Sequence, residues 1–214
     1  MTRSPDILLI GAGGHARVLI DTMSATHEER SIGIIDADAG AIGQSIQDIP
    51  IIGTDAMLKH LAANGARYFA VAVGMNNALR ENLFQTCLDA GLLPLTIVHP
   101  NATISPWATM GQGAQILPGA VVNAGAVLGV NNIINSGAVV EHDCILGDHV
   151  HVSSMACLAG GVILEDLVHV GAGAVIRQMI RVGRGTTIGI GAAVVKDIAP
   201  LQTVVGVPAK EISK

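Results

Sequence analysis

The sequence predicts two consecutive folds, an α/β half-Rossmann-like domain over residues 1–97 and an all-β left-handed parallel β-helix over residues 98–214. Three observations support this prediction. Strand-like and helix-like segments alternate in the first part of the chain, which is typical of a parallel sheet covered by helices. Large aliphatic residues then recur at every sixth position. Aromatic residues make up only 2% of the chain, so the core must consist of repetitively packed aliphatic side chains.

The composition argues against several classes of protein. A net charge of −5 and the scarcity of aromatic residues disfavour nucleic-acid binding. Mean hydropathy is +0.53, yet polar residues interrupt every apolar stretch, so we expect no membrane-spanning segment and no signal peptide. Three cysteines without a CxxC spacing predict neither a disulfide framework nor a zinc site. We therefore expect a cytoplasmic protein that needs no metal.

The first domain is predicted to contain three or four parallel strands joined by helices. The strands are expected at residues 6–11, 31–36, 68–74 and 93–99. The helices are expected at residues 14–25, 54–65 and 76–91. Thr54 is expected to cap the second helix at its N-terminus, and Gly65 is expected to end it.

The second domain carries an unbroken six-residue period. Seventeen consecutive positions six residues apart, from Val98 to Val194, are all large and aliphatic. Four residues after each of them, nearly every position is small or β-branched, and Asn132 is the clear exception. Neither a helix nor a plain strand has this period, whereas a parallel β-helix does. Each repeat then forms one side of a triangular prism, and three repeats form one coil.

This register separates the residues of "VVEHDCILGDHVHVS", residues 139–153, into inward and outward positions. Cys144 points inward, so we expect it to pack in the core rather than to act as a nucleophile. His149 falls on an outward or turn position, and we expect it to be a solvated surface residue.

His142 and His151 also fall on outward or turn positions, but their spacing sets them apart. They lie nine residues apart, which is half a coil, so one chain places them on opposite sides of the prism. A site that uses both histidines therefore needs two neighbouring chains, as in a trimer with heterologous contacts.

Several motifs resemble those of the hexapeptide-repeat sugar acyltransferases, the group of the bacterial sialic-acid O-acetyltransferases and bacillosamine N-acetyltransferases. The motifs are "IGAGGHARV", "AVGMNNALR", "NSGAVVEHDCILGDHVHVS", "LAGGV" and the terminal "VVGVPAK". They extend over the whole chain, and their combination is more specific than any one of them. The resemblance implies an acetyl-CoA-dependent enzyme that forms a homotrimer with active sites between subunits.

The resemblance also implies roles for individual residues. The catalytic base falls on His142 and the carboxylate that orients it falls on Asp143, with Glu141 as a rival. Histidine suits this role because its ordinary pKa, about 6.5, lets it accept a proton near neutral pH. Asn135 is expected to hold the sugar. The contacts with acetyl-CoA fall on His151, Gly160, Gly171, Ala172, Gly189 and Ile190.

The segment "GAGGHA", residues 11–16, matches the dinucleotide fingerprint G-x-G-x-x-A, which favours an NAD-dependent enzyme. However, the first domain is short for a complete dinucleotide fold, and a hexapeptide β-helix has no use for hydride transfer. Half of such a fold can bind one nucleotide. The resemblance implies that this domain binds a nucleotide-linked sugar. The residues implied in these contacts are Gly13, Gly14, His15, Asp36 and Gly74.

The sequence thus predicts an acetyl-CoA-dependent N-acetyltransferase acting on a nucleotide-linked 4-amino-4,6-dideoxy sugar in surface glycan biosynthesis. The same fold and the same histidine would also serve O-acetylation of a sialic-acid-like sugar. Nothing in the sequence separates an amine from a hydroxyl acceptor, or one nucleotide from another. A non-catalytic or metal-binding β-helix, with His142, His149 and His151 as ligands, is the alternative from a different class.

Overall fold

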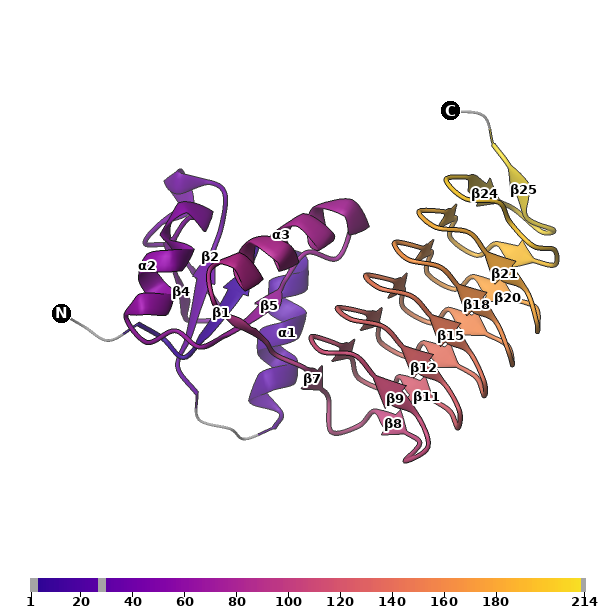
Figure 1. Cartoon of the computed structure of the whole chain (residues 1–214), viewed down its shortest axis with the longest axis horizontal. Helices are drawn as coiled ribbons and strands as arrows, with labels where there is room; N and C mark the ends of the chain where they lie inside the picture. Colours follow the sequence, from indigo (N-terminus) through magenta and orange to yellow (C-terminus); the bar gives the residue numbers. More distant parts are fainter. Residues whose placement is uncertain (1–3, 27–29, 213–214) are drawn as a thin grey trace. The chain divides into compact units, whose positions relative to one another are not determined.

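A computed structural model describes residues 4–26 and 30–212 of the chain. The chain forms two compact units, Met1–Thr96 and Ile97–Lys214. The first unit is a sheet with helices on both faces, and the second is a stack of parallel coils (Figure 1). No helix in the described ranges is long and apolar enough to cross a membrane.

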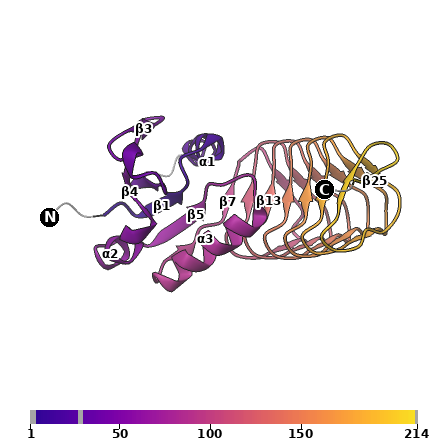
Figure 2. The ribbon, with the colours of Figure 1, turned by 90° about the horizontal axis from the view of Figure 1, so that it is seen from above.

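The first unit is built on one sheet with the strand order β3-β4-β2-β1-β5-β6. Its strands are β1 (Ile7–Ile10), β2 (Ile32–Ile35), β3 (Ser45–Ile46), β4 (Ile49–Gly53), β5 (Tyr68–Val71) and β6 (Leu93–Pro94). Its α- and 3-10 helices are α1 (Gly14–Ser24), η1 (Ala39–Ala41), η2 (Asp55–Met57), α2 (Leu58–Ala63) and α3 (Asn77–Asp89). All strand pairs are parallel except β3 with β4. Right-handed crossovers place α1 on one face and α2 and α3 on the other (Figure 2).

The order in which the chain adds strands to this sheet reverses beside β1. The chain runs from β1 outward to β2 and β4, and then returns to place β5 on the other side of β1. Such a switch point opens a crevice beyond the carboxyl ends of the two strands, where ligands of α/β sheets bind. The loops at this crevice are those that follow β1 and β5.

Three details of the first unit differ from the sequence prediction. The antiparallel pair β3 and β4 was not predicted, because each strand is short and lacks a clear period. Thr54 makes no capping hydrogen bond through its side chain, and the second helix starts as a 3-10 turn and has Asn64 as its C-cap. The fourth predicted strand divides, because Leu93–Pro94 pairs with β5 whereas Ile97–Val98 pairs with a strand of the second unit.

The second unit is a left-handed parallel β-helix whose strands form three sheets. The first sheet contains β7 (Ile97–Val98), β10 (Gln115–Ile116), β13 (Ile133–Ile134), β16 (His151–Val152), β19 (His169–Val170), β22 (Thr187–Ile188), β24 (Thr203–Val205) and β25 (Lys210–Glu211). The second contains β8 (Thr103–Ile104), β11 (Val121–Val122), β14 (Val139–Val140), β17 (Cys157–Leu158), β20 (Val175–Ile176) and β23 (Ala193–Val194). The third contains β9 (Thr109–Met110), β12 (Val127–Leu128), β15 (Ile145–Leu146), β18 (Ile163–Leu164) and β21 (Arg181–Val182).

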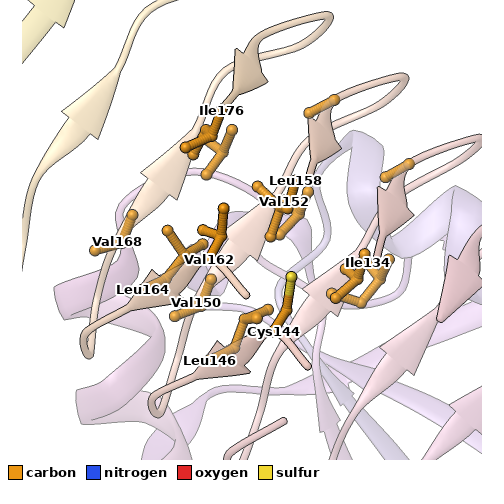
Figure 3. Packing of buried hydrophobic residues seen from close by; sticks show 14 of the residues in the cluster. Ile134, Cys144, Leu146, Val150, Val152, Leu158, Val162, Leu164, Val168 and Ile176 are labelled. Carbon is orange, nitrogen blue, oxygen red and sulfur yellow. The ribbon is translucent and has the colours of Figure 1, made fainter. Parts of the chain in front are cut away.

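The register of these sheets confirms the predicted coil. Ile133 pairs with His151, and Val139 pairs with Cys157, so each residue lies beside the residue 18 positions later. Side chains at the six-residue positions and at the positions four residues after them fill the prism (Figure 3). Cys144 is fully buried in this core, as predicted. Truncating one of these buried side chains, for example Leu158 to alanine, would cost about 2–5 kcal/mol of stability.

Candidate active site

His142 and Asp143 lie in the turn that connects β14 to β15. His142 Nδ1 is 2.9 Å from Asp143 Oδ2, and both side chains are largely exposed. Asp143 has a left-handed backbone conformation, with φ at 60°, which Asp adopts more easily than most residues. An ionised carboxylate only accepts hydrogen bonds, so Nδ1 is the protonated nitrogen of the neutral ring. Nε2 is then free to accept a proton.

The surroundings of His142 make its ring more basic. The pKa of His142 is raised above its ordinary value, chiefly by the hydrogen bond to Asp143 and further by the negative charges of Asp143 and Glu141. Glu141 Oε2 accepts a hydrogen bond from the backbone N–H of His142 at 3.3 Å, not from its ring. The geometry therefore pairs the imidazole with Asp143.

Gly160 lies against the other edge of the His142 ring. A Cβ atom on Gly160 would be 2.5 Å from both Cε1 and Nε2 of His142, so only glycine leaves the ring in its place. A cavity of about 400 Å³ opens beside this pair. It is lined by His142, Asp143, Gly160, Gly161, Gln178 and Met179. Gln178 and Met179 were not predicted, although they lie two coils after His142 and Asp143 in the 18-residue register.

His151 lies on another sheet, in β16, and only 4% of its surface is exposed. Asn135 Nδ2 lies 3.1 Å from His151 Nε2, so Asn135, which was predicted to hold the sugar, contacts this histidine. The His169 ring meets the His151 ring edge to face, with 4.9 Å between their centroids. His169 was missed, although its position one coil after His151 could have indicated it.

His149 is not the solvated residue that the register predicted. Only 7% of its surface is exposed, and its Nδ1 lies 3.0 Å from Asn131 Nδ2. The turn before β16 therefore uses His149 to join successive coils. In the described residues, no group of three His, Cys, Asp or Glu side chains lies close enough to hold a metal ion.

The predicted acetyl-CoA residues are divided between two corners of the prism. Gly160 lies in the corner of His142, between β17 and β18. The other five are carried by the sheet of β16, β19 and β22. His151 lies in β16 itself, and the stacked turns after β19 and β22 contain Gly171, Ala172, Gly189 and Ile190. A Cβ atom on Gly171 would be 2.7 Å from backbone atoms of Gly189 and Ile190, so this glycine is needed for coil stacking. Ile190 is 84% exposed.

The predicted nucleotide residues meet at the switch point of the first unit. Gly13 is the N-cap of α1 and Gly14 its first residue, with no capping side-chain bond and no acidic residue in the first turn. The ring of His15 lies beside Gly74 in the loop after β5, at 3.6 Å from the position of a Cβ atom. Such a bare helix N-terminus suits an anion such as phosphate.

Asp36 shapes this crevice from the end of β2. Its Oδ2 accepts a hydrogen bond from the backbone N–H of Ala12 at 2.7 Å, and its Oδ1 accepts one from Asp38 at 2.9 Å. Asp36 therefore holds the glycine loop in place.

Both units of the chain are similar to known proteins. Residues 6–87 match the family model described as the PglD N-terminal domain. GDP-perosamine N-acetyltransferase of Escherichia coli O157:H7 is 30% identical over 111 residues, and this match spans 50% of the chain and 49% of that relative.

Solved structures match over nearly the whole chain. PerB of Caulobacter crescentus, in complex with CoA and GDP-perosamine, is 34% identical with a TM-score of 0.90, and 97% of each chain is covered. The acetyltransferase domain of PglB from Neisseria gonorrhoeae, in complex with acetyl coenzyme A, is 38% identical with a TM-score of 0.87, covering 96% of this chain and 98% of that one.

Proposed function

The chain belongs to the hexapeptide-repeat family of sugar acyltransferases, and we propose that it transfers an acetyl group from acetyl-CoA to the amine of a nucleotide-linked sugar. The acceptor in this proposal is a 4-amino-4,6-dideoxy sugar that is used for the synthesis of a surface glycan. The observation that carries this proposal is the His142–Asp143 pair beside the bare backbone of Gly160, in an open cavity of the β-helix.

The pair suits an acyl transfer from a thioester to an amine. Acetyl-CoA supplies an activated carbonyl carbon and a thiolate leaving group. As the amine nitrogen bonds to that carbon, His142 Nε2 accepts the amine proton, while Asp143 stabilises the resulting imidazolium. The carbon–sulfur bond breaks, and the proton passes from His142 to the sulfur. The products are an N-acetylated sugar and free CoA.

The site is completed by a second subunit in this proposal. His142 and Gly160 lie at one corner of the prism, whereas His151 and the Gly171–Ala172 turn lie at another. A homotrimer of parallel prisms would bring the first corner of one chain to the second corner of its neighbour. The small residues at the second corner, among them Gly189, leave the backbone accessible to the pantetheine arm. Ile190 offers it an exposed apolar side chain.

The first domain, residues 1–97, supplies the nucleotide site in this proposal. The N-terminus of α1 at Gly13 and Gly14 faces the phosphates, and His15 and Gly74 line the same crevice. The β-helix, residues 98–214, supplies the acyltransferase site. Because acetyl-CoA and nucleotide sugars are cytoplasmic metabolites, we expect the reaction to occur in the cytoplasm.

An amine acceptor is favoured over a hydroxyl acceptor by the relatives. PerB was solved with GDP-perosamine and CoA bound, and the matching relative of Escherichia coli is an N-acetyltransferase. His142 could also deprotonate a hydroxyl, so the choice must be tested directly.

The decisive experiment is an acceptor panel with acetyl-CoA, in which free thiol release and the mass of the sugar product are measured. The panel contains GDP-, UDP- and dTDP-linked 4-amino-4,6-dideoxy sugars, the matching 4-hydroxy sugars and a sialic acid. We expect turnover with one of the amino sugars and little with its 4-hydroxy counterpart. Acetylation of the hydroxyl compounds alone would refute the proposal.

A further inference from the structure

Met179 stands in a conformation that methionine seldom adopts. Its φ is 61°, in the left-handed region that favours Gly, Asn and Asp, and 77% of its surface is exposed. A Cβ atom on Gly161, one coil earlier, would lie 2.5 Å from Met179 Sδ, so the thioether rests on bare backbone. The β-helix accommodates such a residue, because Met155 repeats this arrangement away from the cavity, so the conformation alone does not explain a methionine at position 179.

The position of Met179 in the site offers a reason. Among the six residues that line the cavity of His142, Met179 has the one large apolar side chain. Gln178 precedes it and can both donate and accept hydrogen bonds. The wall of the cavity next to the base is therefore part polar and part apolar.

The acceptor sugar likewise carries one polar group and one apolar group on either side of its reacting amine. The amine is carried by C4, whose ring neighbours are C3, which bears a hydroxyl, and C5, which bears the C6 methyl group. An amine held at His142 Nε2 thus brings one hydroxyl and one methyl group close to the cavity wall. We infer that Met179 receives the C6 methyl group and selects 6-deoxy sugars over sugars with a hydroxyl on C6. This inference rests on the proposed function.

The selection follows from the weak hydrogen bonding of a thioether. A C6 hydroxyl pressed against Met179 would lose its water partners and gain little in return, whereas a methyl group loses nothing. Apolar pockets discriminate against an added hydroxyl by up to about 10²-fold. We expect a preference of that order in kcat/KM.

The test uses the full-length protein and two acceptors, GDP-linked 4-amino-4,6-dideoxymannose and the same compound with a hydroxyl on C6. If the wild type uses only UDP or dTDP sugars, the corresponding pair linked to that nucleotide takes their place. Met179→Asn keeps a residue that favours the left-handed conformation and removes the apolar wall. Its kcat/KM ratio for the two acceptors should fall by at least about tenfold. Met179→Leu should retain the wild-type ratio.

Met155 provides a matched control. Its φ is 60°, it is 69% exposed, and its sulfur rests on Gly137 in the same way, but it does not line the cavity. Met155→Asn should leave the acceptor ratio unchanged. An unchanged ratio in Met179→Asn, or an equal change in Met155→Asn, overturns the inference while the proposed function stands. A wild-type protein that acetylates none of the GDP-, UDP- and dTDP-linked amino sugars overturns both.

Discussion

At the scale of single residues, the two nitrogens of His142 have different tasks. Asp143 engages Nδ1, and Nε2 faces the cavity edge beside Gly160. Replacing His142 with alanine should lower kcat by about 10²–10⁴-fold, because the amine loses its base. CoA binding, measured by calorimetry, should change little. Variants of the Caulobacter relative with one histidine replaced still bind CoA and GDP-perosamine. Near-normal turnover would exclude His142 as the base.

The bond from Asp143 to His142 predicts a pH effect. His142 must be neutral to accept a proton, and the bond raises its pKa, so activity falls as the pH drops through that raised value. Asp143→Asn lowers the pKa of His142 and should move the acid limb of the kcat/KM profile to lower pH. Asparagine also tolerates the left-handed conformation, so the turn is preserved.

Glu141→Gln is the control for this effect. It removes a neighbouring charge without removing a ring hydrogen bond, so its shift of the acid limb should be smaller. A larger shift in Glu141→Gln than in Asp143→Asn would show that Glu141 is the carboxylate that raises the pKa of His142.

At the scale of elements, the turn between β17 and β18 holds the base in place. The equivalent turn positions one and two coils away carry His142, Gln178 and Ala124, so the backbone accepts a side chain at this position. Gly160→Ala should therefore act through its clash with the imidazole and lower kcat by at least about tenfold. In a His142→Ala background the same substitution should not lower the melting temperature. A loss of stability there would assign Gly160 a purely structural role.

Substitutions at the N-terminus of α1 test whether the phosphates of the nucleotide bind there. A Cβ atom on Gly14 would meet nothing within 4 Å, so Gly14→Ala should change neither the fold nor the KM for the nucleotide sugar. Gly14→Asp suits the helix dipole and should leave the fold intact, but its charge would repel phosphates by roughly 1–4 kcal/mol. The KM for the nucleotide sugar should rise by about tenfold or more, while the KM for acetyl-CoA stays constant. Equal effects of both variants would place the phosphates elsewhere.

At the scale of the whole molecule, the separation of His142 from His151 predicts complementation between subunits. Inactive His142→Ala and His151→Ala proteins, refolded together in equal amounts, should regain activity because about a quarter of the clefts then contain both histidines. Each parent must melt near the wild-type temperature, since His151 is buried. Inactive mixtures of well-folded parents would place both histidines in one subunit's site.

The six-residue period was sufficient to determine the β-helix, because only that fold places every sixth side chain in one core. The base and its carboxylate are adjacent in sequence, so their pairing could also be predicted. The glycine loop after β1 could be predicted for the same reason, because the strand, the tight turn and the helix are consecutive in the sequence.

Contacts between coils were decided by the tertiary structure alone. The edge-to-face contact of His169 with His151, the burial of His149 and the place of Met179 beside His142 join residues at least 18 positions apart. A repeat pattern says which side chains point outward, but not which of them their neighbours on adjacent coils cover. The pair β3 and β4 escaped prediction for a related reason. Strands this short owe their pairing to the sheet they join rather than to their own sequence.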